Sequence, residues 1–437
     1  MSELFSADDV RTVGISLGGR AEEDIIVDYV PEAGGSSVAQ RFIDAWENTF
    51  RKDTEERNSR IADIMAGSRP VLTDIRRASE CVPGMEDRVL LHSGPPAAYG
   101  ELGEGLRRAL AAAVMHEGWA SVPGEAVELL RTGRVRIDSA DGHSASAARC
   151  GVISPSMPVF RVCDRRTGCF IYAPAAIYGR EKLSDGICSE AAERDLRFAE
   201  DHLVPVLADA LLSHGNIDIL EIAKEGMASG DDCCLRTHHS GALFREIILE
   251  EAVSSGTEIT KELLVYLGQP HLFLELFTAA VKAMLAAART EEGCSFITSL
   301  CSNGRSVGIR IAGKGDRWFT ADLGEDAVCG DEIVCELAGA GTAALCGAPA
   351  AAEKTGLGLS ELLGMMHESF AASDRYVGAL AIPYSGCPGT PLFVDFIKMC
   401  RNSCPIRVSY ERNGAYAVKQ MGLGLQIEAL KAFVSER

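Results

Sequence analysis

VLLHSGPPAAYGELGEGLRRALAAAVMHEGWA, residues 89–120, joins a short apolar run, a Gly-Pro turn and an amphipathic helix pattern. The run Val89–Leu91 is typical of a buried strand. After Gly100, apolar residues recur every three or four positions, at Leu102, Leu106, Leu110 and Ala113. This spacing places them on one face of a helix. We therefore expect a strand, a sharp loop and a helix, a unit whose loop often lines ligand crevices in open α/β folds.

The loop of this unit, HSGPP, has two interpretations. Ser93 and Gly94 carry backbone N–H groups that could bind a phosphate. Pro95 and Pro96 have no N–H group, so the loop is not the lysine-containing cradle of Walker-type sites. In the alternative interpretation, Gly and Pro only shape a rigid turn that places the helix on the sheet.

Composition limits the class of protein and its partners. The 437 residues are 47% hydrophobic and 24% charged, which is typical of a chain that buries two or three cores. The net charge of −19 repels nucleic-acid phosphates and anionic lipids, so we expect neither nucleic acid nor membrane as a partner. A local arginine pocket would still accommodate a small anionic substrate.

Targeting and cysteine patterns favour a cytoplasmic protein. The N-terminus lacks the basic and apolar regions of a signal peptide. The apolar stretch Leu272–Ala288 contains Glu275 and Lys282, so we expect it to be too short and too charged to span a membrane. The 15 cysteines are scattered through the chain, which favours reduced thiols over a disulfide framework.

The sequence predicts no metal site. Cys233-Cys234 and His238-His239 are adjacent pairs, and zinc sites normally separate such residues by two to five positions. An alternative is cysteine chemistry, in which Cys234 would lie near a histidine in a cleft and have a lowered thiol pKa.

The chain as a whole alternates mixed and helical regions. Strand patterns precede residue 183, the stretch 183–288 is helical nearly throughout, and Phe296–Ile311 is a hairpin. Asn303-Gly304 predicts a type I′ turn in that hairpin. A further strand is expected at Ala379–Ile382.

Several blocks resemble one family. They are HSGPP with HEGWA, CVPGMEDRVLL (81–91), PSMPVFRV (155–162), the Gly-Asp-Asp stretch from Gly230, and GIRIAGKGDRWFTA (308–321). The ends match loosely, through VGISLGG and VDYVPEAGG near the start. On these blocks the chain resembles the YlbE/YahG-like family, long catalogued as a domain of unknown function. One branch, AllG, is a subunit of the oxamate carbamoyltransferase of anaerobic allantoin breakdown.

The resemblance implies a multidomain α+β fold, with mixed-sheet α/β domains and a helical middle domain. We expect an N-terminal α/β domain at 1–80, a central one at 81–182, the helical domain at 183–290, and a C-terminal α/β domain at 291–437 that packs against 81–182. It also implies a subunit of a carbamoyltransferase-like complex, beside an FdrA-like subunit and a third protein, in a homo- or hetero-oligomer. The complex would move a carbamoyl group between a ureido compound and phosphate in purine or ureide nitrogen metabolism, without an organic cofactor.

The matching blocks also supply the candidate site residues. We expect His143, Asp231 and Arg236 in catalysis, with Asp231 orienting neighbours and Arg236 binding a carboxylate or phosphate. A second set, in which glycines permit close backbone approach, is expected to bind substrate: Ser93, Gly94, Arg310, Asp331, Gly339 and Gly341. Each has a structural alternative, such as an N-cap for Asp231 or an exposed strand charge for Arg310.

Two departures from the family pattern favour a second hypothesis. Cys234 stands where the family has a histidine, and Glu411 or Arg412 stands near the place of another. The chain is then a non-catalytic structural or regulatory subunit that has lost active-site histidines, so whether it is an enzyme is open. The enzyme hypothesis predicts that Asp231, Arg236, Arg310 and Asp331 converge in one cavity.

Overall fold

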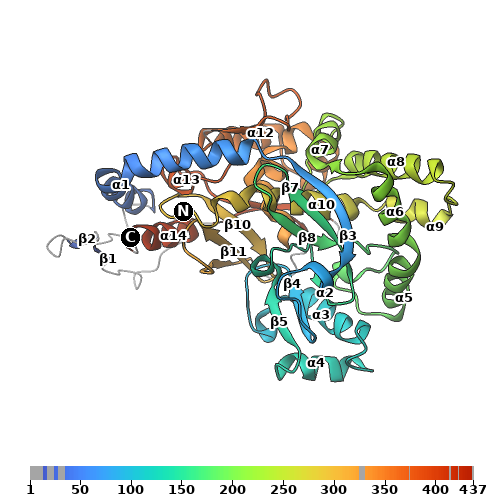
Figure 1. The fold of residues 1–437 in the computed structure, drawn as a ribbon. Helices are drawn as coiled ribbons and strands as arrows, with labels where there is room; N and C mark the ends of the chain where they lie inside the picture. Colours follow the sequence, from blue (N-terminus) through green and yellow to red (C-terminus); the bar gives the residue numbers. More distant parts are fainter. Residues whose placement is uncertain are drawn as a thin grey trace.

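The computed structural model describes residues 13–16, 24–27, 35–323, 330–373, 375–412, 415–421 and 423–435. It confirms an α+β fold, in which helices surround several small sheets (Figure 1). The first two strands are β1 (Val13–Ser16) and β2 (Asp24–Val27), and they pair antiparallel. Gly18 and Gly19 of the VGISLGG stretch lie outside the described residues.

Helix α10 (Pro270–Leu285) is the central element, and every residue from Leu272 to Leu285 is buried. Its surroundings explain this burial, because α10 packs against two sheets and against three helices. These helices are α7 (Ile219–Ala228), α8 (His238–Ser254) and the 3₁₀ helix η7 (Asp331–Ala338). Our expectation that this stretch is too short and too charged to span a membrane is wrong, because by length and composition alone the helix could cross one. The span Pro270–Ala288 passes that test, but 83% of it is buried inside the protein, as in a core helix.

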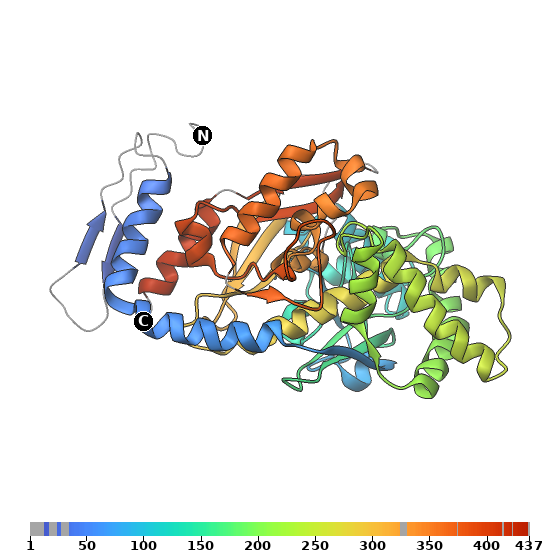
Figure 2. The same cartoon turned by 90° about the horizontal axis from the view of Figure 1, so that it is seen from above.

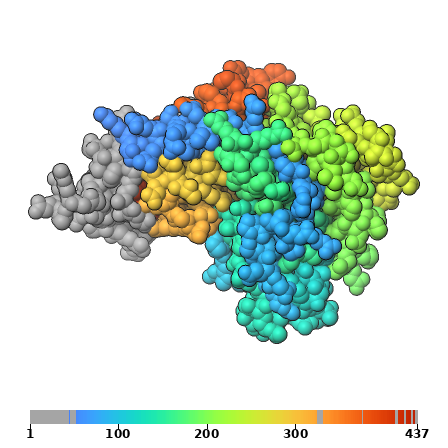
Figure 3. All heavy atoms as spheres, viewed as in Figure 1, coloured from blue at the N-terminus to red at the C-terminus, as the bar shows by residue number. Residues whose placement is uncertain are grey.

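The strand–loop–helix unit expected at residues 89–120 is confirmed. Strand β4 (Val89–His92) leads through the short η2 (Tyr99–Glu101) to α3 (Glu104–His116). After α4 (Pro123–Arg131) the chain returns as β5 (Arg136–Ser139), parallel to β4. Strand β6 (Val152–Ile153) pairs antiparallel on the other edge of β4. This unit forms the lobe below the body of the molecule, coloured blue to teal in Figure 3.

A four-stranded antiparallel sheet covers one side of α10. Its order is β8 (Phe170–Pro174), β7 (Pro158–Asp164), β3 (Pro70–Arg77) and β9 (Ile217–Asp218). Strands β7 and β8 pair around the turn at residues 165–168, as the sequence predicts. Strand β3 connects α1 (Gly35–Ala66), which lies at the other end of the molecule (Figure 2), to the lobe.

The stretch 183–288 is helical nearly throughout, as expected. Helices α5 (Glu190–Phe198), the π-helix η5 (Ala199–Leu203), α6 (Val204–His214), α7 (Ile219–Ala228), α8 (His238–Ser254) and α9 (Lys261–Leu267) gather on the right of Figure 1. They share one hydrophobic core with the rest of the body, because a continuous cluster runs from Ile61 to Phe433 through α10. The last helix of the stretch therefore belongs to both regions.

The hairpin of β10 (Ile297–Ser302) and β11 (Ser306–Ile311) is confirmed, with β12 (Phe319–Asp322) on its edge. The prediction of a type I′ turn is wrong. That turn needs a positive φ at both central residues, and of Asn303 and Gly304 only Gly304 has a positive φ, at +78°. The Asn303 side chain instead accepts hydrogen bonds from the backbone N–H groups of Arg305 and Ser306, at 3.2 and 2.9 Å. A side-chain acceptor thus closes a longer loop.

The C-terminal region carries most of the short elements. Its helices are η8 (Gly341–Ala343), η9 (Leu345–Gly347), α11 (Pro349–Thr355), α12 (Leu359–Ala371), α13 (Phe396–Arg401) and α14 (Leu423–Ser435), with a hairpin of β15 (Arg407–Arg412) and β16 (Ala415–Gln420). The strand expected at Ala379–Ile382 is absent there. The chain turns at that point, where Leu380 N–H donates a hydrogen bond to Val377 O. The strands on either side of this turn are the short β13 (Tyr376–Val377) and β14 (Thr390–Pro391), which pair antiparallel.

Gly94 shows why the HSGPP loop needs its glycine. Its φ is +83°, and a Cβ atom there would lie 2.2 to 2.4 Å from the backbone of Ser302 and Asn303. The loop is therefore pressed against the end of β10, which joins the lobe to the hairpin sheet.

We expect Gly94→Ala to lower the free energy of unfolding by about 2–4 kcal/mol, because it adds a backbone clash to an unfavourable φ. Gly118→Ala is the control, since Gly118 has a φ of +69° and open space around its Cβ position. It should cost only about 1–2 kcal/mol, the left-handed penalty alone. Urea unfolding measures both, and equal losses would contradict the packing argument.

His116 ties the lobe to the helical region. Its ring nitrogens lie 3.2 Å from Glu193 Oε2 and 3.2 Å from Glu200 Oε1, so α3 is joined to α5 and η5. Burial disfavours the charged ring, but hydrogen bonds to the two carboxylates outweigh it and raise the pKa of His116 to about 9. The ring is therefore an imidazolium at neutral pH.

The raised pKa predicts a pH-dependent stability. The contribution is complete below the ordinary histidine pKa of 6.5 and is lost as the pH rises through about 9. We expect about 1–3 kcal/mol to disappear over this window, measured by urea unfolding at successive pH values. His116→Gln should flatten this part of the profile, and an unchanged profile would exclude His116 as its source.

Candidate functional site

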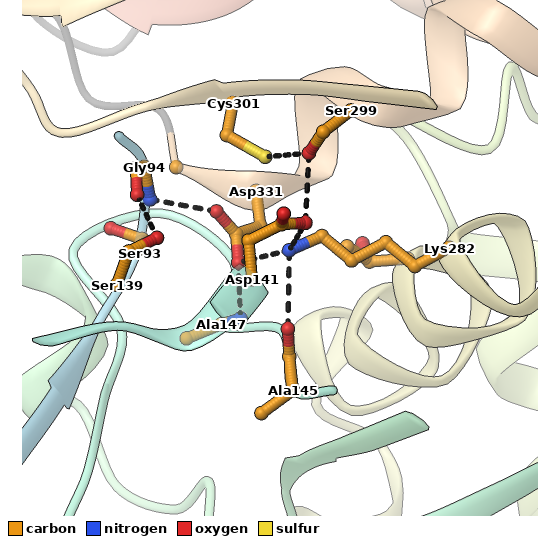
Figure 4. A network of polar contacts seen from close by, with 12 residues as sticks. Ser93, Gly94, Ser139, Asp141, Ala145, Ala147, Lys282, Ser299, Cys301 and Asp331 are labelled. Carbon is orange, nitrogen blue, oxygen red and sulfur yellow. Dashed lines mark hydrogen bonds and ion pairs between the residues drawn. The ribbon is translucent and has the colours of Figure 1, made fainter. Parts of the chain in front are cut away.

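A fully buried ion-pair network lies where α10 meets the lobe (Figure 4). Lys282 Nζ donates to Asp331 Oδ2 at 2.8 Å and to Ala145 O at 3.2 Å, and it lies 3.4 Å from Asp141 Oδ1. Burial disfavours the ammonium, but Asp331 and Asp141 outweigh it and hold the pKa of Lys282 above its ordinary value. Lys282 is therefore charged and joins three segments of the chain.

Asp141 forms ion pairs with two arginines as well as with Lys282. Arg289 donates to it at 2.7 Å and Arg310 at 2.8 Å, and the Ser299 hydroxyl donates at 2.8 Å. Burial alone would raise the pKa of Asp141, but Arg289, Lys282 and Arg310 hold it well below its ordinary value. Arg310, expected to bind substrate, is thus neutralised by Asp141 and by Asp316 at 2.8 Å.

Consecutive backbone amides of the Ser- and Ala-rich loop each donate to a different carboxylate. Ala147 N donates to Asp331 at 3.0 Å, Ala148 N to Glu275 at 3.1 Å, and Arg149 N to Glu332 at 2.7 Å. Burial raises the pKa of Glu275 well above its ordinary value and raises that of Glu332. The loop has the shape of an anion-binding nest, and the protein's own acidic side chains fill it.

The backbone N–H groups of the HSGPP loop also donate to acceptors within the protein. Gly94 N donates to Asp331 Oδ1 at 2.8 Å, and Ser93 N donates to Gly151 O at 3.2 Å. The two N–H groups that we expected to offer to a phosphate therefore have partners. Of the two interpretations, the geometry fits the rigid turn.

Sequence reasoning missed the two charges that organise this network. Glu275 and Lys282 interrupt an apolar stretch, and we treated them only as an obstacle to membrane insertion. They are seven residues apart, which places them on the same helix face two turns apart. Both bind the loop at residues 145–148. A pair of charges at helical spacing in an otherwise apolar helix was the available signal.

A second cluster forms around Arg236, in the loop before α8. The Asp231 carboxylate accepts from Ser240 N at 2.8 Å and from the Ser240 hydroxyl at 2.9 Å, and it lies 3.6 Å from Arg236 Nε. Asp231 is therefore a cap for the start of α8 that also orients Arg236. The terminal guanidinium nitrogens of Arg236 have no hydrogen-bond partner among the described residues.

Arg236 opens onto a cavity of about 220 Å³ between α8, the start of α10, and the hairpin of β15 and β16. Positive charge on its wall comes from Arg149, Arg236 and Lys354. Two histidines, His238 and His271, also line it. The acidic lining residues are Glu332 and Glu411. The balance is positive in a protein whose net charge is −19, so the cavity suits a small anion.

The cavity wall contains strained backbone. Arg149, which lines the cavity, is a non-glycine residue with a left-handed φ of 60°, and Cys233, next to the lining residue Cys234, has a φ of 58°. Such conformations cluster at functional sites, where surrounding contacts hold them. Arg149 is held by its side chain, which pairs with Asp185 and Glu411 at 3.0 Å each. Its position in the wall is thus rigid.

The single cavity expected to hold Asp231, Arg236, Arg310 and Asp331 is absent. Arg310 and Asp331 belong to the buried network, and only Arg236 lines the cavity. The sequence could not predict that these residues separate, because even the adjacent residues Asp331 and Glu332 lie in different sites. The first carboxylate binds Lys282, and the second lies beside the cavity.

The remaining expected site residues have structural contacts. His143 Nδ1 lies 2.7 Å from Pro83 O, and its Nε2 lies 3.3 Å from Asp138, away from the cavity. Gly339 ends η7 with φ +71°, and a Cβ atom there would lie 2.5 Å from Pro391 O.

Gly341 approaches an anionic group closely, but that group belongs to the protein. A Cβ atom at Gly341 would lie 2.6 Å from Glu336 Oε1 and 3.0 Å from Ser409 Oγ. Burial raises the pKa of Glu336 to about 7. The small-residue turn therefore accommodates Glu336 rather than a phosphate.

The cysteine hypothesis is wrong in its prediction of a lowered pKa. Cys234 lines the cavity, but burial first and Glu336 second raise its thiol pKa well above the ordinary value. Its sulfur accepts a hydrogen bond from the Ser409 hydroxyl at 3.4 Å rather than facing a histidine. Within the described part of the chain, no group of three His, Cys, Asp or Glu residues has metal-binding geometry.

Comparison with known proteins shows which proteins this chain resembles. The model of the oxamate carbamoyltransferase subunit AllG matches residues 135–329. The uncharacterized protein YahG of Escherichia coli (strain K12) is 25% identical over 293 residues, which are 66% of this chain and 62% of that protein. The oxamate carbamoyltransferase subunit AllG of the same organism is 28% identical over 272 residues, 61% of this chain and 65% of that protein.

The chain is similar to the YahG and AllG proteins. It spans about 62–65% of the length of these curated relatives. A crystal structure of a conserved protein of unknown function from Enterococcus faecalis V583 matches with a TM-score of 0.82 at 23% identity. The match covers 88% of this chain and 99% of that chain, and it shows the shared fold. The YahG/AllG-like region at 135–329 includes Arg149, Arg236 and His271 of the cavity.

We expect Lys282→Met to lower the free energy of unfolding by about 3–5 kcal/mol, because Asp331 and Asp141 lose a buried partner. Lys224→Met is the matched control, since Lys224 pairs with Glu221 on the surface at 46% side-chain exposure. It should leave the free energy of unfolding nearly unchanged, because solvent screens an exposed ion pair. Similar losses for the two variants, measured by urea unfolding, would show that the network does not stabilise the fold.

Proposed function

We propose that this YahG/AllG-like chain is a subunit of a carbamoyltransferase-like complex and that the Arg236 cavity binds its small anionic substrates. The proposal rests mainly on the guanidinium of Arg236, whose terminal nitrogens have no hydrogen-bond partner among the described residues and face a cavity with a net positive lining. A guanidinium in this setting is suited to bidentate binding of a carboxylate or phosphate.

The positions of the two family departures support the choice of cavity. Cys234 stands where the family has a histidine, and Glu411 or Arg412 stands near the place of another. Cys234 and Glu411 both line this cavity. They come from segments 177 positions apart in the sequence (411 − 234), so their meeting is a property of the fold. The side chains that distinguish this chain from its family therefore gather where we place the substrate.

The proposed reaction transfers a carbamoyl group between a ureido compound and phosphate. A phosphate oxygen forms a bond to the ureido carbonyl carbon, the bond from that carbon to the substituted nitrogen breaks, and this nitrogen gains the proton lost by phosphate. Carbamoyl phosphate and an amide or amine result. Arg236, Arg149 and Lys354 would offset the negative charge that develops on the carbonyl oxygen.

The proposed partners are an FdrA-like subunit and a third protein. The relative with a described activity is itself named a subunit of oxamate carbamoyltransferase, which supports an assembly of several chains. Purine or ureide nitrogen metabolism is the setting in which we propose that the complex works.

A second candidate function is a non-catalytic structural or regulatory subunit of such a complex. The observation in its favour is that neither Cys234 nor Glu411 is an imidazole. Glu411 instead forms an ion pair with Arg149 at 3.0 Å, which reduces the positive charge available to a ligand.

A co-purification experiment separates the two functions. The chain is expressed with the products of adjacent genes, and the resulting complex is assayed for carbamoyl phosphate formation from a panel of ureido acids. Activity that depends on Arg236 supports the enzyme. An assembled complex whose activity is unchanged by Arg236→Gln supports the non-catalytic subunit.

We expect Arg236→Gln to weaken binding of inorganic phosphate to the chain by about 10- to 100-fold, the loss of a charged hydrogen-bond partner. Arg134→Gln is the control, because it removes the same charge from an exposed turn after α4. It should leave the dissociation constant within about twofold. Isothermal titration calorimetry measures both, and equal effects would place the phosphate elsewhere.

A further inference from the structure

His271 occupies a distinctive place in the Arg236 cavity. It is the second residue of α10, directly after Pro270, so its ring stands at the positive end of the buried central helix. The Thr237 hydroxyl donates to Pro270 O at 2.7 Å and ties this helix start to the loop that carries Arg236. His271 and Arg236 therefore line one cavity from two connected segments.

The His271 ring lacks a structural role of the kind seen in other histidines. Its Nδ1 is buried and has no hydrogen-bond partner among the described residues. Both ring nitrogens of His116 pair with carboxylates, and both of His143 have acceptors within 3.3 Å. A buried nitrogen without a partner costs free energy unless a ligand or water satisfies it.

Charge around His271 keeps the ring neutral. Burial first, and the positive charge of Arg149 second, lower the pKa of His271 to about 4, against the smaller opposing effect of Asp185. Lys182 also lowers it, and the cavity wall adds Arg236 and Lys354, with Glu332 and Glu411 opposing them. At neutral pH the empty cavity thus presents an imidazole that can accept a proton.

We infer that His271 is the residue that moves the proton during carbamoyl transfer, an inference that rests on the proposed function. Monohydrogen phosphate, held by Arg236, gives its proton to the imidazole as its oxygen bonds to the ureido carbon. The imidazolium then gives that proton to the nitrogen whose bond to carbon breaks. His271 begins and ends neutral, and every atom is accounted for between phosphate, the ureido compound and the two products.

A bound phosphate should raise the pKa of His271 and so make the ring a more effective proton carrier. The dianion offsets the charges of Arg149 and Arg236, so the cationic effect that suppresses protonation of the ring is reduced. The pKa of His271 should then rise towards neutrality, where a histidine accepts and releases a proton most effectively. Substrate binding and proton transfer are thereby coupled through the same arginines.

The first measurement uses the full chain alone. Nuclear magnetic resonance of ¹³C- and ¹⁵N-histidine-labelled protein follows the His271 ring, identified by the signal that His271→Gln removes. Inorganic phosphate is the probe. We expect the His271 pKa to lie below the ordinary 6.5 without phosphate and to rise when phosphate is added, and Arg236→Gln should remove the response.

The second measurement uses the assembled complex. We expect His271→Gln to lower kcat for carbamoyl phosphate formation by about 10²-fold or more, with the KM for phosphate within about threefold and partial rescue by added imidazole. His367→Gln is the matched control, since His367 is exposed on α12. It should leave kcat and the pH profile unchanged.

The outcomes separate the inference from the function on which it rests. An active complex in which His271→Gln retains kcat and the pH profile overturns the role of His271 and leaves the proposed function standing. The same holds if phosphate shifts the His271 signal but kcat does not fall, because the ring then only contacts the ligand. A wild-type complex that forms no carbamoyl phosphate overturns both.

Discussion

The buried ammonium of Lys282 is the interaction on which the arrangement of this protein depends. A lysine at the centre of a core helix is costly unless its charge is met inside the protein. Asp331 and Asp141 form ion pairs with the Lys282 ammonium, and each carboxylate anchors its own segment of chain to α10. The lobe, the hairpin sheet and the C-terminal region are thus joined at one point by charge rather than by apolar packing alone.

This network also determines where the cavity forms. Asp331, Glu275 and Glu332 hold the amides of residues 147–149 in order, which leaves Arg149 in a left-handed conformation at the cavity wall. The charges of the buried network are therefore neutralised internally, whereas the terminal nitrogens of Arg236 have no hydrogen-bond partner among the described residues. The proposed binding site rests on this difference between the two sets of cations.

The relation to the YahG/AllG-like family acquires a structural meaning at the same cavity. Cys234 and Glu411 line it, and so does His271. In our proposal the imidazole of His271 supplies the acid–base group that carbamoyl transfer needs. The fold shared with the solved relative supplies the scaffold, and the chemistry depends on these few side chains.

The sequence by itself determined the elements, since strand and helix patterns at residues 70–131, 158–174 and 297–311 follow from local periodicity and turn residues. It also predicted a role for Arg236 from a family block, and the structure places this residue in the wall of the cavity. It misassigned Ser93, Gly94 and Arg310, because local patterns do not reveal that a distant carboxylate already occupies a donor. Only the tertiary structure decided that Asp331 faces Lys282 while its neighbour Glu332 lines the cavity, because which partner meets a charge depends on packing between segments far apart in the chain.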